Sequence, residues 1–127
     1  MMTRILVVDD SLTVRMELKE ALSAFDVACV ASGEEAIDFL GAQSADIIFM
    51  DLGMPGLSGI ETCKIIKLNP GWRDIPVVIF TAQSGKETLV ECLKAGAANY
   101  IVKSDDYDLL KACIHNMLSN LRGFPAL

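Results

Sequence analysis

The sequence predicts an α/β fold in which a five-stranded parallel sheet is covered by helices on both faces. Five short apolar runs alternate strictly with segments whose apolar residues recur every three or four positions. The first run, residues 5–8, is apolar throughout, which is typical of a strand that is buried on both faces. Strict alternation of strands and helices favours parallel strands joined by helical crossovers.

The strands and helices each have a local signal in the sequence. Apolar runs predict strands over residues 5–8, 26–31, 46–50, 76–80 and 99–102. The first helix is indicated by four apolar residues on one helical face, namely Val14, Leu18, Leu22 and Phe25. The last helix is indicated in the same way by Leu110, Cys113, Ile114, Met117, Leu118 and Leu121.

Capping boxes predict where the second and fourth helices begin. Ser32 is followed three residues later by Glu35, and Ser84 is followed by Glu87 at the same spacing. In such a box each side chain satisfies a backbone N–H at the start of the helix. The third helix is expected over residues 60–68, because the Asn-Pro-Gly sequence that follows cannot continue it.

Length and charge limit the domain organisation and the partners. The chain has 127 residues, which suits one domain, and we expect that domain over residues 1–122 with a C-terminal tail over residues 123–127. The net charge of −6 argues against a nucleic-acid partner, and no apolar run approaches the length of a membrane span. The four cysteines lie in apolar periodic segments, which indicates reduced thiols and a cytoplasmic protein.

Carboxylates follow two of the predicted strands. Asp9 and Asp10 end the first apolar run, and Asp51 ends the third. Right-handed crossovers leave few topologies, and of these we choose the doubly wound strand order 2-1-3-4-5, which places these two strands side by side. The three carboxylates then meet at one edge of the sheet, where their mutual repulsion favours binding of a divalent cation. The alternative is that each aspartate caps the helix or turn that follows its strand.

Two more polar residues follow predicted strands. Thr81 comes directly after the fourth strand and Lys103 directly after the fifth. Taken alone, the threonine is explained as a helix cap and the lysine as a solvated charge. Together with the three carboxylates, they make a set in which cation, hydroxyl and ammonium surround a dianionic phosphoryl group. This set predicts phosphoryl transfer with a carboxylate as the covalent acceptor.

The order of these motifs resembles that of a response-regulator receiver domain of the chemotaxis-regulator kind. The motifs that carry the resemblance are Asp9-Asp10, Asp51 with Met54-Pro55-Gly56, Thr81-Ala82 and Tyr100-Ile101-Val102-Lys103. The resemblance covers essentially the whole chain. It implies a flavodoxin-like (βα)5 fold and a role in two-component signalling. It further implies a phosphoacceptor that assists its own phosphorylation and dephosphorylation, and not an enzyme.

The resemblance also implies roles at the acidic edge. Asp51 would be the phosphoacceptor, and its donor would be a histidine kinase or a histidine phosphotransfer protein. Asp10, Asp51 and the backbone carbonyl of Gly53 would bind Mg²⁺ directly. Asp9 would contribute to the metal site through water.

The remaining motif residues would bind the phosphoryl group and switch a surface. Lys103 would pair with the phosphoryl oxygens or with Asp51. Thr81 would move to hydrogen-bond the phosphoryl group, and Tyr100 would exchange an exposed rotamer for an inward one. The change would reach the surface formed by the fourth helix, the fifth strand and the fifth helix.

Two positions depart from the family's pattern. Ser104 follows Lys103, where the family usually has proline, often in a cis peptide. A cis bond before a non-proline residue costs about 2.5–4 kcal/mol, which favours a trans bond and a differently shaped loop here. Gly53 places no side chain beside the phosphoryl group, and Gln83 occupies the other flanking position.

Other protein classes fit the motifs less well. A phosphohydrolase of the haloacid-dehalogenase type needs a second aspartate two residues after the nucleophile, where this chain has Gly53. A flavin carrier of the flavodoxin type needs a hydroxyl-rich loop after its first strand, where Asp9 and Asp10 would repel the phosphate. His115 and Trp72 are expected to be structural residues. The sequence leaves open the output partner, and whether the chain is a stand-alone regulator or a receiver module of a hybrid histidine kinase or another multidomain protein.

Overall fold

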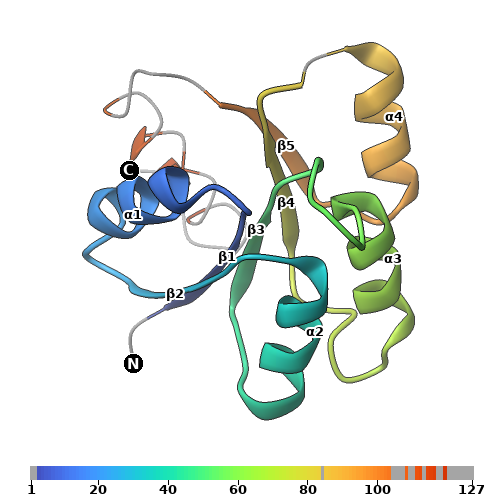
Figure 1. Ribbon diagram of the computed structural model, residues 1–127, viewed down its shortest axis with the longest axis horizontal. Coiled ribbons are helices and arrows are strands. Elements are labelled where there is room, and N and C mark those ends of the chain that lie inside the picture. The colour runs from blue at the N-terminus through green and yellow to red at the C-terminus, as the bar shows by residue number, and fades with distance from the viewer. Residues whose placement is uncertain are drawn as a thin grey trace.

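The computed structural model describes residues 3–83 and 85–103, together with residues 108, 111, 112, 114–116 and 119. The sheet has the strand order β2-β1-β3-β4-β5, and every neighbouring pair is parallel (Figure 1). The strands are β1 (Arg4–Val8), β2 (Asp26–Val30), β3 (Ile47–Met50), β4 (Val77–Thr81) and β5 (Asn99–Val102). The predicted fold class and strand order are confirmed.

Helices cover both faces of this sheet. They are α1 (Leu12–Ala21), α2 (Gly33–Ala42), α3 (Gly59–Leu68) and α4 (Lys86–Lys94). Helix α1 lies on one face, and α2, α3 and α4 lie on the other (Figure 1). Residues 114–116 are helical, and Ile114 packs on the same face as α1. The rest of the predicted last stripe lies outside the described residues: Leu110, Cys113, Met117, Leu118 and Leu121.

Alternate strand residues point to opposite faces, so the sheet separates two apolar layers. Facing α2, α3 and α4 are Leu6, Val8, Ile48, Met50, Val77 and Ile79. Facing α1 are Ile5, Val7, Ile47, Phe49, Val78 and Phe80. Burial on both faces is the reason that the central strands read as unbroken apolar runs.

The helix starts agree only in part with the predicted caps. Ser32 caps α2 as expected, and its hydroxyl accepts a hydrogen bond from the Glu35 N–H. The complete capping box lies at α3, between Ser58 and Glu61, where the sequence interpretation had placed none. Extending the helix to include this box moves the start of α3 to Gly59.

The predicted start of α4 was one residue too early. Gly85 caps this helix without a side-chain hydrogen bond, and Ser84 lies outside the described residues. Gly85 has a φ of 144°, a conformation that a residue without Cβ adopts readily. The chain therefore turns into α4 at a glycine, and Glu87 is one position nearer the cap than a capping box requires.

Helix α4 is less buried than α2 and α3, the other two helices on its face of the sheet, and the neighbouring strand β5 is partly exposed. Within α4, Cys92 is the buried residue, while Leu89, Val90 and Leu93 are exposed. Both ends of β5 are also exposed, including Val102. None of the helices in the described residues has the length and apolar character needed to cross a membrane.

Candidate functional site

The carboxyl ends of β1 and β3 bring three carboxylates together. Val8 pairs with Met50 in the sheet, so the next residues, Asp9 and Asp51, leave the two strands side by side. Oxygen atoms of Asp9, Asp10 and Asp51 all lie within 4.8 Å of one another. Asp9 and Asp51 are buried, whereas Asp10 is exposed to solvent. The parallel register thus produces the acidic edge that was expected from the sequence.

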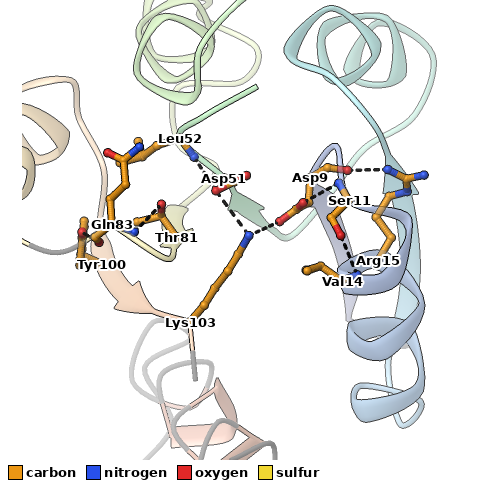
Figure 2. Close-up of polar contacts among 10 residues, drawn as sticks. All are labelled: Asp9, Ser11, Val14, Arg15, Asp51, Leu52, Thr81, Gln83, Tyr100 and Lys103. Carbon is orange, nitrogen blue, oxygen red and sulfur yellow. Dashed lines mark hydrogen bonds and ion pairs between the residues drawn. The ribbon is translucent and has the colours of Figure 1, made fainter. Parts of the chain in front are cut away.

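Lys103 lies between two of these carboxylates (Figure 2). Its Nζ is 2.6 Å from Asp9 Oδ2 and 3.5 Å from Asp51 Oδ1. The backbone of Lys103 donates to the Thr81 carbonyl, which fixes the lysine at the end of β5. The shorter ion pair is with Asp9, a partner that the sequence interpretation did not assign to Lys103. The almost fully buried Asp9 carboxylate, 1% exposed, needs such a cation nearby.

The environment of Asp51 disfavours its anionic form. Burial first, and then the charge of Asp9, raise the pKa of Asp51 above the ordinary aspartate value. Lys103 and the Leu52 N–H, which donates to Asp51 Oδ1 at 2.9 Å, lower the pKa but offset only part of this rise. A cation brought next to Asp51 would relieve the same penalty.

Side chains of α1 and its cap hold the loop that carries Asp9. The Ser11 N–H donates to Asp9 Oδ1 at 2.8 Å, and Arg15 Nη1 donates to the Asp9 backbone carbonyl at 2.7 Å (Figure 2). Ser11 also caps α1 by accepting from the Val14 N–H. Sequence reasoning missed Arg15. Its signal is weak, because an arginine in the second turn of a helix is usually a surface charge.

Thr81, Gln83 and Tyr100 form a connected chain of hydrogen bonds. The buried Thr81 hydroxyl accepts from the Gln83 N–H at 3.2 Å. The Tyr100 hydroxyl, from β5, donates to the Gln83 carbonyl (Figure 2). The backbone of Gln83 therefore links Thr81 and Tyr100, the two residues that are expected to switch. The sequence identified Gln83 only as a position beside the site.

Gly53 lies in the loop that follows Asp51. A Cβ on Gly53 would be 3.7 Å from Gln83 Nε2, so the Gln83 side chain reaches the same space from the opposite loop. Ser104, the other departure from the family's pattern, lies outside the described residues.

The donor set at the acidic edge fits a hard divalent cation. Carboxylate oxygens are the ligands that Mg²⁺ and Mn²⁺ prefer, and three of them converge here. Magnesium usually binds one or two carboxylates and completes its shell with water or substrate phosphate. The exposed Asp10 beside the buried Asp51 leaves a solvent-facing side for such ligands.

The other residues singled out in the sequence lie away from this edge. The His115 ring packs 5.1 Å from the Phe25 ring, and Trp72 packs against the apolar layer of α2 and α3. Both have structural surroundings, as expected. Three cysteines are free thiols, namely Cys29, Cys63 and Cys92, and Cys113 lies outside the described residues.

Comparison with known proteins assigns the chain to one family. A family model described as the response regulator receiver domain matches residues 5–115. The chain belongs to this family, and is thus a receiver domain of the two-component response regulators.

Individual relatives and structures agree with this assignment. A chemotaxis protein CheY homolog of Campylobacter jejuni is 33% identical over 124 residues, covering 94% of this chain and 95% of that protein. The transcriptional regulatory protein ZraR of Escherichia coli is 39% identical over 125 residues, covering 96% of this chain. The chain spans only 28% of the length of ZraR. The response regulator TrrA of Thermotoga maritima, solved with Mg²⁺ and BeF, has a TM-score of 0.78 and 34% identity, covering 90% of this chain and 97% of TrrA.

Proposed function

We propose that Asp51 is the phosphoacceptor of this receiver domain. A histidine kinase or a histidine phosphotransfer protein supplies the phosphoryl group in a step that needs Mg²⁺. The observation that carries the proposal is the convergence of Asp9, Asp10 and Asp51 with the ammonium of Lys103. The Mg²⁺-BeF complex of the related TrrA is consistent with this reading.

The contacts of Asp51 indicate which of its oxygens attacks. The Leu52 N–H and Lys103 Nζ both approach Oδ1, which supports Oδ2 as the oxygen that attacks phosphorus. The new Oδ2–P bond forms as the N–P bond of the phosphohistidine breaks, and the imidazole nitrogen leaves with that electron pair. Lys103 shifts from Asp9 towards the phosphoryl oxygens and neutralises part of their charge.

The metal site is proposed for the same edge. Asp10, Asp51 and the Gly53 carbonyl hold Mg²⁺ directly, and Asp9 holds it through water. When bound, Mg²⁺ neutralises charge on the phosphoryl oxygens during transfer.

Phosphorylation then changes the surface formed by α4, β5 and the helix after β5. To reach a phosphoryl oxygen, the Thr81 hydroxyl gives up its bond with the Gln83 N–H, and the loop after β4 moves. Tyr100, bound to the Gln83 carbonyl, moves with this loop. Exposed apolar residues on this side, Leu89, Val90, Leu93 and Val102, suit a surface that binds a partner.

The domain is proposed to span residues 1–122, with a tail over residues 123–127, and to act in the cytoplasm. Neither the CheY homolog nor ZraR identifies the output partner of this chain. The CheY homolog matches this chain over nearly its whole length, whereas ZraR is several times longer. Both the stand-alone and the multidomain arrangement therefore have a counterpart among the relatives.

Labelling with a small phosphodonor tests the phosphoacceptor. Incubation with acetyl phosphate and Mg²⁺ is expected to add one phosphoryl group, with release of acetate, in a base-labile bond detected by mass spectrometry. Asp51→Asn is expected to abolish the adduct. Asp38→Asn, an exposed aspartate on α2, is the matched control and should label like the wild type. Undiminished labelling of Asp51→Asn would overturn the assignment.

A further inference from the structure

The loop between β3 and α3, residues 51–58, is fixed tightly at both of its ends. The Leu52 N–H donates to Asp51 Oδ1, and the Gly59 N–H donates to the Leu52 carbonyl at 2.9 Å. A Cβ on Gly59 would lie 2.1 Å from the Asp51 carbonyl oxygen. Helix α3 therefore starts directly against the backbone of the phosphoacceptor, and the loop between them carries Gly53.

The middle of this loop is held by a side chain from a different helix. Glu34, in the first turn of α2, accepts a hydrogen bond from the Leu57 N–H through Oε1 at 3.2 Å. A Cβ on Gly56 would be 2.3 Å from Glu34 Oε2. Gly56 also has a φ of 76°, which favours glycine. The Glu34 carboxylate thus lies against the bare backbone of Gly56 and Leu57.

A second glycine brings Glu34 within reach of the loop. A Cβ on Gly33 would be 2.0 Å from Thr62 Oγ1 and 3.0 Å from Leu57 Cβ. The start of α2 consequently packs on both α3 and the loop at a distance that any larger residue would prevent. Gly33 sets the close approach of the helix, and Gly56 leaves the space that the carboxylate fills.

We propose that Glu34 is a positioning residue for the cation site, although it belongs to none of the motifs that define that site. The inference rests on the proposed function, because it concerns the same metal. Glu34 holds residues 56 and 57, and thereby fixes the loop path that presents the Gly53 carbonyl and the Asp51 carboxylate together. Magnesium demands near-ideal octahedral geometry, so looser placement of one ligand lowers its affinity.

Two substitutions separate positioning from charge. Glu34→Asp keeps the charge but shortens the side chain by one methylene, so it no longer reaches the Leu57 N–H. Glu34→Gln loses the charge but keeps an acceptor oxygen at full reach. Glu35→Gln is the matched control, because Glu35 lies in the same helical turn and contacts Ser32 and Ala31 instead of the loop.

The first measurement is the Mg²⁺ dissociation constant by titration calorimetry. Outer partners of metal ligands typically change affinity 10- to 100-fold, and for this exposed partner we expect about a tenfold rise in Glu34→Asp. Glu34→Gln and Glu35→Gln should stay within about threefold of the wild type, the size expected for a modest loss of charge attraction at the surface. Weakened Mg²⁺ binding in Glu34→Gln, with wild-type affinity in Glu34→Asp, would assign the effect to charge and overturn the positioning role.

The second measurement needs no metal. Amide hydrogen exchange at Leu57, recorded in EDTA, is expected to quicken in Glu34→Asp and to stay unchanged in Glu35→Gln. Thermal melts in EDTA verify that each variant is folded. A wild type that binds no Mg²⁺ would overturn the proposed function itself. A wild type that binds Mg²⁺, with unchanged affinity and Leu57 exchange in Glu34→Asp, would overturn the inference on Glu34 alone.

Discussion

Replacing Lys103 with methionine is expected to make the stability of the fold depend more strongly on Mg²⁺ than it does in the wild type. Methionine keeps much of the volume of the side chain but removes the ammonium that contacts Asp9 and Asp51. Among the described residues, the Asp9 carboxylate then keeps one hydrogen-bond partner, the Ser11 N–H, and is still buried. Without a cation, this arrangement should unfold more easily, and a bound Mg²⁺ should replace much of the lost positive charge.

The distances give the size of the effect. At an effective dielectric constant of about 20, the attraction over 2.6 Å to Asp9 is about 6 kcal/mol before desolvation is subtracted. Over 3.5 Å to Asp51 it is about 5 kcal/mol. Removing one partner of a buried pair costs about 3–5 kcal/mol in measured cases. Because 21% of the Lys103 side chain is exposed, we expect a loss of about 2–3 kcal/mol in EDTA.

Urea denaturation with and without Mg²⁺ measures this loss. Thermal melts give a second measure of the loss, and in EDTA the melting temperature of Lys103→Met should be about 10 °C below that of the wild type. In saturating Mg²⁺ the loss should shrink to about 1 kcal/mol, which by thermodynamic linkage requires about tenfold tighter Mg²⁺ binding to the variant. Lys64→Met, which removes an exposed lysine of α3, is the control and should change neither quantity. If Mg²⁺ stabilised the wild type and Lys103→Met equally, Lys103 and the cation would not share these carboxylates.

Three further predictions concern the same edge. Millimolar Mg²⁺ should raise the melting temperature of the wild type, because a Mg²⁺ concentration of ten times Kd adds about 1.4 kcal/mol to the free energy of unfolding. The rise should be smaller in Asp10→Asn. The raised pKa of Asp51 means that its contribution to metal-free stability is present below the ordinary carboxyl pKa and is lost as pH rises through the folded value. In EDTA, the free energy of unfolding of Asp51→Asn should therefore rise relative to that of the wild type as the pH increases above the ordinary aspartate pKa. A difference between the two that stays constant with pH would contradict the burial argument. In NMR spectra with Mg²⁺ and beryllofluoride, shifts should spread from Asp51 to Tyr100 and Ile114, whereas Thr81→Ala should confine them to the pocket.

The sheet and its acidic edge were predictable because they depend on local pattern and parallel topology. An apolar run that ends in Asp9-Asp10 and another that ends in Asp51 become neighbours once the strand order is known. The start of α4 was misplaced because serine is the stronger capping signal, whereas the chain turns at Gly85. The capping box of Ser58 and Glu61 was missed because its serine lies in a loop rich in glycine.

Contacts between side chains of separate elements were beyond the reach of sequence reasoning. Lys103 lies 94 residues from Asp9, and no spacing rule tells whether it approaches Asp9 or Asp51 more closely. The contacts of Arg15 with the Asp9 carbonyl and of Glu34 with Leu57 depend on how two helices pack on the sheet. Such contacts produce no repeating pattern in the sequence, because each depends on a single residue at a single position.

The weak burial of α4 and β5 affects how a structural change at Asp51 can spread through the fold. Local opening is easiest where few apolar side chains are withdrawn from water, and in α4 that withdrawal is limited chiefly to Cys92. The β1, β3 and β4 strands, buried along nearly their whole length, form a stiff platform under Asp9 and Asp51. A local rearrangement at Asp51 therefore meets high resistance towards the middle of the sheet and low resistance towards its β5 edge. We therefore expect a rearrangement at Asp51 to spread more easily towards β5 than towards β1, even when no partner is bound.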